Sequence, residues 1–149
     1  MKRYITLTFL ILSFIITGCG KKDDIVCLEL ANSFYESSLF EERLEEIDSS
    51  AAETRYGFNN RDYSEIAAFI GTKAVCDEFL IVKTTDTEKI KSAINKYLDD
   101  KIKDYELYRP DEVYKLTKPL MLEYNGTVVV VICHDTNAAE KVYKEYLKS

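Results

Sequence analysis

Hydrophobic positions recur along this chain with two different periods. Over residues 84–106 apolar side chains return every three or four positions, as they do on a helix that buries one face. This stripe consists of Ile90, Ile94, Tyr97, Leu98, Ile102 and Tyr105. Thr85 and Glu88 have the spacing of a capping box, which favours a helix start just before the stripe. The pattern predicts one long amphipathic helix.

The C-terminal third has the pattern of a β-hairpin. Leu120–Tyr124 and Thr127–His134 flank Asn125-Gly126, whose residues tolerate the positive φ angles of a tight turn. Val128–Ile132 is apolar at every position. We therefore expect a central strand there, covered on both faces.

Residues 63–83 have two interpretations. Asp62 and Glu65 are spaced like a capping box, which would start a short helix ended by Gly71. Alternatively, a turn at Gly71 leads into Phe79–Val82, which has the composition of a strand. We expect a second hairpin here.

The region after residue 24 begins with a helical pattern. Within Ile25–Ser37, apolar residues repeat at four-residue spacing at Val26, Leu30 and Phe34. Residues 38–48 interleave acidic pairs with apolar residues. This second pattern fits either a continued helix or an irregular arm.

Three further segments are predicted to be helical. Ser49–Tyr56 reads as a short helix closed by Gly57, and Pro110 favours a later helical turn. Asp135 or Thr136 can cap a final helix. The apolar stripe of that helix is Ala139, Val142, Tyr143, Tyr146 and Leu147.

These elements define an α+β fold. Their order is helix, two strands, helix, two strands, helix, so about four strands form two hairpins of a mostly antiparallel sheet with helices packed on it. Residues 25–149 are enough for one such domain and too few for two. We expect a single domain.

The N-terminus has the pattern of a lipoprotein signal peptide. Two basic residues precede Tyr4–Ile16, an uncharged and mostly apolar run. Ile16-Thr17-Gly18-Cys19 resembles a lipobox, in which small residues expose the backbone to a peptidase and the cysteine thiolate accepts a diacylglyceryl group. Cleavage between Gly18 and Cys19 would make Cys19 the lipidated first residue.

This prediction divides the chain into three parts: a signal peptide over 1–18, a lipidated cysteine with a short tether over 19–24, and the domain over 25–149. The apolar run is shorter than the roughly 20 residues of a spanning helix, so an uncleaved anchor fits less well. An ordinary secretory signal with an incidental Cys19 is the other alternative. Lipid on Cys19 would hold the protein at the extracytoplasmic face of the cell membrane. The tether reaches less than about 20 Å, so the domain would work near the bilayer.

The net charge of the chain limits the classes of partner that it can bind. It carries 20 basic and 26 acidic residues, a net charge of −6 that cleavage of the basic N-terminus makes more negative. Such a charge argues against nucleic acid and against electrostatic attraction to an anionic bilayer. Membrane attachment would then depend on the lipid alone.

Three cysteines remain besides Cys19. Cys27, Cys76 and Cys133 are odd in number, so at most one intramolecular disulfide can form among them. Cys76 and Cys133 lie in strand-like segments and are the candidate pair, whereas free buried thiols are the interpretation we favour. No pair has the CxxC spacing of a redox motif or a zinc knuckle.

No catalytic motif is recognisable. His134-Asp135 invites a metal-hydrolase interpretation, but the chain has one histidine, and a strand-end histidine before a helix cap explains the pair. Nucleophile-elbow, P-loop and dinucleotide-binding glycine patterns are missing. We expect a non-enzymatic protein with no cofactor and no catalytic residues.

Two function classes remain. The first is an interaction or accessory domain with a protein partner in the cell envelope. The second is a small-ligand or cation binder in which acidic residues 41–46 supply the oxygens, although a solvated acidic face is the interpretation of these residues that we favour. The glutamates concerned are Glu41, Glu42, Glu45 and Glu46.

The chain from about Tyr56 onward also resembles a family of small lipoproteins of Gram-positive bacteria, the domain of unknown function 4358 family. The matching landmarks are Tyr56-Gly57, Asp77-Glu78 before Phe79–Lys83, Tyr108-x-Pro110-x-Glu112 and Asn125-Gly126. None of them is a catalytic signature. The resemblance therefore implies fold and location, and it implies no role for the thiol of Cys76.

Overall fold

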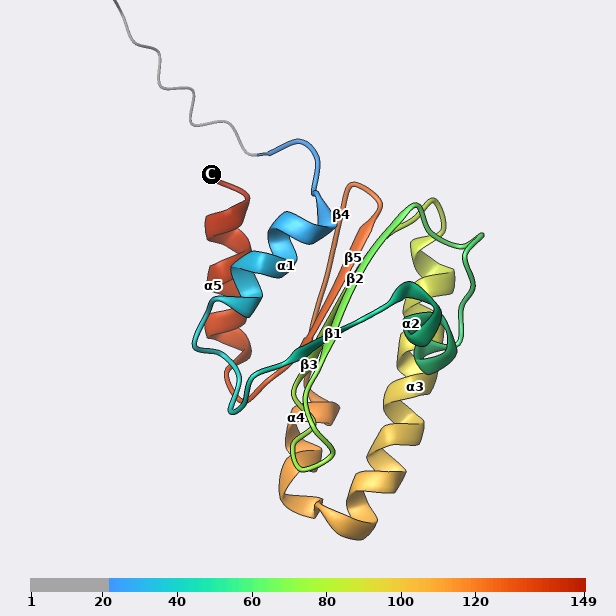
Figure 1. The fold of residues 1–149 in the computed structure, drawn as a ribbon, viewed down its shortest axis with the longest axis vertical. Coiled ribbons are helices and arrows are strands. Elements are labelled where there is room, and N and C mark those ends of the chain that lie inside the picture. The colour runs from blue at the N-terminus through green and yellow to red at the C-terminus, as the bar shows by residue number, and fades with distance from the viewer. Residues whose placement is uncertain (1–21) are drawn as a thin grey trace, which may run out of the picture.

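A five-stranded antiparallel sheet runs through the middle of the protein (Figure 1). The computed structural model describes residues 22–149, so the expected signal peptide and Cys19 lie outside the described residues. The strand order is β1-β2-β3-β5-β4, and every neighbouring pair is antiparallel. The strands are β1 Glu45–Ile47, β2 Glu65–Ile70, β3 Glu78–Lys83, β4 Leu120–Tyr124 and β5 Thr127–Ile132.

Helices cover both faces of this sheet. In Figure 1, α1 and α5 lie on one side, and α2 and α3 lie on the other. A short 3-10 turn and α4 lead from α3 to β4. The bounds are α1 Cys27–Tyr35, α2 Ser49–Tyr56, α3 Thr87–Tyr108, the 3-10 turn Pro110–Glu112, α4 Val113–Thr117 and α5 Thr136–Tyr146.

Each face has its own hydrophobic core, because successive side chains of a strand point to opposite faces. On β3, Phe79 belongs to the core under α1 and α5, whereas Leu80 belongs to the core under α2 and α3. On β5 the neighbours Val129 and Val130 divide in the same way. All six residues of β5 are buried, which confirms the prediction of a central strand covered on both faces.

The α+β class and both predicted hairpins are confirmed, but the sheet has five strands instead of about four. The additional strand, β1, lies in the segment whose pattern fitted either a helix or an arm. It pairs with β2, where Ile47 lies opposite Ala68. Because residues 65–70 form β2, the helical alternative with Asp62 as its cap is wrong. Asp62 instead accepts a hydrogen bond from the Asn59 N–H.

Two helix starts differ from the sequence prediction. The cap of α3 is Asp86, which accepts a hydrogen bond from the Lys89 N–H, so the capping box expected at Thr85 was one residue early. A carboxylate is a good acceptor at this position. Val26 was expected on the buried stripe of α1, but it precedes the first helical turn in an extended conformation and is exposed.

The chain reversals are as expected. Asn125 and Gly126 have φ angles of 45° and 76°, which confirms the tight turn between β4 and β5. Asp135 caps α5 through the N–H groups of Asn137 and Ala138.

Among residues 22–149, no helix combines the length and apolarity needed to cross a membrane.

Candidate functional site

Two consecutive acidic residues are buried where the chain enters β3. Asp77 and Glu78 are 1% and 2% exposed, respectively. Burying a carboxylate is costly unless cations and hydrogen-bond donors surround it, so each marks a built polar site. The two residues have no partner in common, and their surroundings differ.

Asp77 belongs to a closed ion cluster around Lys115 of α4. The Lys115 ammonium, which is fully buried, donates to Asp77 at 2.9 Å, to Glu112 at 3.0 Å and to Glu41. The second oxygen of Asp77 accepts from the Glu41 N–H at 2.8 Å. Three carboxylates thus surround one cation, and the cluster ties the segment before β1 to α4.

Electrostatic interactions in this cluster stabilise the charged forms of Lys115 and Glu112. Burial alone would lower the pKa of Lys115, but its hydrogen bonds to Glu41, Asp77 and Glu112 outweigh that and raise it. Burial alone would raise the pKa of Glu112, but the Cys76 N–H and Lys115 outweigh that and lower it. The shifts therefore favour the charged forms of Lys115 and Glu112, which are paired with each other.

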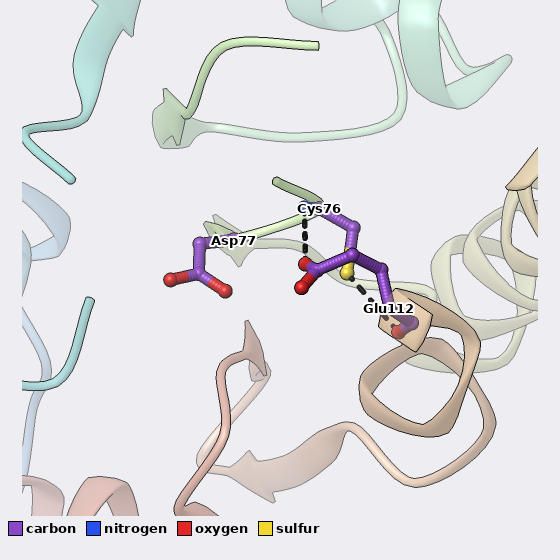
Figure 2. A group of neighbouring side chains, drawn as sticks. All are labelled: Cys76, Asp77 and Glu112. Atoms are coloured by element: carbon purple, nitrogen blue, oxygen red, sulfur yellow. Dashed lines mark hydrogen bonds between the residues drawn. The ribbon is translucent and has the colours of Figure 1, made fainter. Parts of the chain in front are cut away.

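The same cluster contains a candidate metal triad, Cys76, Asp77 and Glu112, whose potential ligand atoms lie within 4.8 Å of one another. Figure 2 shows these side chains, with two hydrogen bonds that join Cys76 to Glu112. Burial raises the pKa of the Cys76 thiol to about 12, so it is protonated and a poor ligand. The Lys115 ammonium already pairs with both carboxylates. The arrangement fits an internal ion cluster better than a metal site.

Glu78 belongs to a second cluster, between the sheet and helices α2 and α3. Its Oε2 atom accepts from Arg55 at 2.6 Å, from Lys101 at 2.7 Å and from the Tyr97 hydroxyl at 3.0 Å. The Lys101 side chain is 10% exposed and that of Arg55 is 30% exposed. Two cations therefore meet a single carboxylate.

Aromatic rings surround these charges. The Arg55 guanidinium lies 5.2 Å from the centre of the Tyr97 ring, and the Lys101 ammonium lies 5.6 Å from that of Tyr105. Such cation–π contacts stabilise charges in partly desolvated places. Tyr97, Lys101 and Tyr105 occur at four-residue intervals on α3, so they share one face of the helix.

The second cluster opens into a cleft of about 790 Å³. The cleft is lined by the end of α2, by the β2–β3 connection and by α3 from Ala93 to Tyr108. In Figure 1 the β2–β3 connection and the end of α3 lie at the end of the molecule opposite the start of α1, and α2 lies beside the middle of α3. A volume of this size matches the range of ligand pockets.

Two oxygens in the wall of this cleft are buried without a hydrogen-bond partner among the described residues. They are Oε1 of Glu78 and the hydroxyl of Tyr56, and Nε of Arg55 is likewise buried and unpaired. These three atoms lie beside one another, because Arg55 and Glu78 act on the pKa of Tyr56 through side-chain hydrogen bonds, yet none of the three has a partner of good geometry. Burial raises the pKa of Tyr56 far above its ordinary value, so this phenol stays a neutral donor.

The structure separates the glutamates that were considered as a cation site. Glu41 pairs with Lys115, while Glu42 accepts hydrogen bonds from Thr72. Glu45 and Glu46 are consecutive residues of β1, and both are exposed. No convergent oxygen cage is formed by these four residues.

The other sequence candidates lie apart from the cleft. His134 is exposed after β5, and Asp135 serves as the cap of α5. Cys27, Cys76 and Cys133 are free buried thiols. Cys76 and Cys133 belong to the cores on opposite faces of the sheet, so the structure holds no bridge between them.

Sequence reasoning missed Arg55, Lys101 and Lys115. One signal was available: Asp77-Glu78 stands directly before an apolar strand, where two carboxylates need cations. The partners lie 23 to 38 positions away on three different helices, and periodicity does not reveal such distant pairing.

The protein is thus a single α+β domain with a cleft between its sheet and one of its two helical layers. A family described as Domain of unknown function (DUF4358) matches residues 37–134, and the chain belongs to this family. The cleft lies entirely within the matched residues, whereas α1 and α5 lie outside them. No curated protein and no solved structure gave a significant match.

Proposed function

We propose that this protein is a lipid-anchored, extracytoplasmic binding domain of the cell envelope with an accessory, non-enzymatic role. Lipid on Cys19 would hold it to the membrane, and the cleft beside Glu78 would bind its partner. The observation that carries the proposal is the cleft itself. Its volume lies in the range of small-molecule pockets, and buried polar atoms without hydrogen-bond partners lie in its wall.

The position of the cleft supports this proposal. The first described residue, Lys22, donates its backbone N–H to the carbonyl of Leu147 near the C-terminus. The β2–β3 connection and the end of α3 lie at the far end of the molecule (Figure 1). A domain tethered through residues 19–21 can therefore turn its cleft away from the bilayer.

Exposed apolar side chains beside the cleft give a partner additional surface. Leu107 is 87% exposed and Tyr108 is 52% exposed at the end of α3, and Tyr108 lines the cleft. Large exposed apolar residues beside a pocket are typical of binding surfaces.

The chemistry of the nucleophile candidates supports a non-enzymatic role. Burial raises the pKa of the Cys27 and Cys76 thiols to about 12 and that of Cys133 to about 11. Thiols of this kind stay protonated near neutral pH and react poorly. His134 is exposed and does not line the cleft.

The membrane part of the proposal is tested by Cys19→Ser. We expect this variant to lose the mass of the lipid and to leave the membrane fraction, because one thioether carries the whole attachment. A matched Cys27→Ser variant should keep both. Unaltered mass and fractionation of Cys19→Ser would contradict the anchor.

The binding part is tested by photo-crosslinking in cells. A photoreactive residue at Tyr108, beside the cleft, should capture a specific envelope component. The same residue at the exposed Lys141 on α5, on the opposite face, should not capture it. Equal recovery from both positions, or recovery of abundant bystanders only, would count against a functional cleft.

A further inference from the structure

We infer that the cleft takes a small anionic ligand with a flat ring, whose carboxylate or phosphate is held by Arg55 and Lys101 while the ring packs on the tyrosines of α3. This inference rests on the proposed binding role of the cleft. It adds the chemical class of the ligand, which the contacts around Glu78 specify.

The charge at the inner wall of the cleft is positive. Arg55 and Lys101 both pair with Glu78, so two cations meet one anion. The other lining acids are engaged elsewhere or exposed: Asp77 pairs with Lys115, and Asp100 pairs with Lys96 and Lys103. Lys73 and Asp104 at the rim are exposed and opposite in sign. The whole lining holds four basic and four acidic side chains, and the local excess of one positive charge lies at Arg55, Lys101 and Glu78.

The two cations also keep unused donors. Arg55 has five N–H groups and donates one hydrogen bond, through Nη2 to Glu78. Its Nε is buried, so the donors within reach of a ligand are its remaining Nη N–H groups on the exposed part of the side chain. Lys101 has three N–H groups, of which one is used on Glu78. Planar guanidinium next to an ammonium is a donor set suited to a carboxylate or a phosphate.

The tyrosine rings of the cleft favour a ligand that also carries a flat ring. Tyr56, Tyr97, Tyr105 and Tyr108 all line the cleft. The Tyr56 and Tyr97 rings meet edge to face, with centres 4.7 Å apart, and Tyr105 lies 4.9 Å from Tyr108. Offset and edge-to-face contacts with a further ring are favourable in such a wall. A bare inorganic anion would leave this surface unused.

A cationic ligand is disfavoured by the same contacts. Its charge would lie beside two cations, and the one buried carboxylate already accepts three hydrogen bonds on Oε2. Membrane lipid is disfavoured as the source of the anion, because the β2–β3 connection and the end of α3, which line part of the cleft, lie at the end of the domain away from the start of α1 (Figure 1). The ligand is therefore a soluble molecule.

Calorimetric titration of the full-length protein in non-ionic detergent tests this inference. The probes are benzoate and phenyl phosphate as ring anions, benzyl alcohol as the neutral ring and benzylammonium as the ring cation. We expect one or both anions to bind and the neutral and cationic rings to bind at least about tenfold more weakly, the effect of one charge-assisted hydrogen bond. A preference between the two anions identifies which acidic group the site accepts.

Variants locate the site. Lys101→Met should weaken anion binding about tenfold, while Lys101→Arg, which keeps the charge, should retain most of it. Lys103→Met is the matched control on the same helix outside the cleft and should bind as the wild type does. Circular dichroism and the unfolding midpoint establish that each variant is folded.

Three results would overturn the inference: no binding of either anion, binding of benzylammonium as tight as that of benzoate, or anion binding that survives both Lys101→Met and Arg55→Met. The crosslinking experiment at Tyr108 does not depend on these probes. If the cleft captures a component in cells but binds neither anion, the inferred ligand class is wrong and the proposed function is retained.

Discussion

The two buried ion clusters of this domain contain consecutive residues, Asp77 and Glu78, but they differ in their ratio of cations to carboxylates. Around Asp77, one fully buried lysine is shared by three carboxylates. Around Glu78, two partly accessible cations share one carboxylate, and one carboxylate oxygen stays unpaired. Asp77 also reaches the cleft, but both of its oxygens are paired within the first cluster, whereas the second cluster presents its cations to the cleft.

The difference separates a structural role from a binding role. A buried pair whose donors and acceptors are all used holds its segments in place, and it offers nothing to a ligand. A cluster with spare donors and an unpaired buried oxygen has interactions left for a partner. The charge balance has opposite sign as well: acids outnumber the cation at Lys115, and cations outnumber the acid at Glu78.

The largest expected effect comes from the closed cluster. Lys115→Met leaves Asp77 and Glu112 buried without their cation, which costs about 3–5 kcal/mol in the free energy of unfolding. Urea denaturation measures this loss. Lys103→Met, which removes an exposed pair with Asp100, should cost less than about 1 kcal/mol. Equal losses in the two variants would show that the Lys115 cluster is not structural.

Lys101→Met should have an intermediate effect. Glu78 keeps Arg55 and Tyr97 as donors, so its carboxylate is not left alone. We expect a loss of about 1–2 kcal/mol in urea denaturation, in the range of one charged hydrogen bond. A loss as large as that of Lys115→Met would remove the distinction between the clusters.

Acid should weaken the closed cluster. The pKa of Glu112 is lower in the folded protein than its ordinary value of 4.5, so the folded state binds fewer protons than the unfolded chain. Its stabilising contribution is therefore present above about pH 4.5 and is lost as the pH falls through the lowered folded pKa. Urea midpoints measured between pH 6 and pH 3 should fall more steeply for the wild type than for Glu112→Gln. Parallel curves would contradict this assignment.

The smallest effect is expected from thiol reagents. Cys76 lies beside the closed cluster, and burial raises its pKa to about 12. The folded protein at pH 8 should therefore show almost no labelling of Cys27, Cys76 and Cys133 by a thiol-specific dye, and three labels per chain in urea. Rapid labelling of Cys76 under native conditions would show that the cluster is open to solvent.

Much of the fold could be predicted from local patterns. The turn at Asn125-Gly126, the buried strand Val128–Ile132 and the apolar stripe of α3 all depend on residues close in sequence. β1 could not be predicted, because three residues carry too little periodicity and their place is set by pairing with β2. The strand order, in which β3 pairs with β5, is likewise set by contacts between distant segments.

The cleft was less accessible to sequence reasoning. Tyr97 and Tyr105 were identified correctly as part of a helical stripe, but the same stripe describes a plain core helix. Only the fold brings Arg55 of α2 and Lys101 of α3 to the carboxylate of Glu78. The acidic residues that drew attention in the sequence, Glu41 to Glu46, instead have separate surroundings.

One measurement tests the contrast between the clusters most directly. Side-chain nitrogen NMR signals of Arg55, Lys101 and Lys115 can be followed in the full-length protein while phenyl phosphate is added. We predict saturable shifts of Arg55 Nε–H and Lys101 Nζ, with the Lys115 signal unmoved. Shifts at Lys115 with Arg55 and Lys101 unchanged would contradict this prediction.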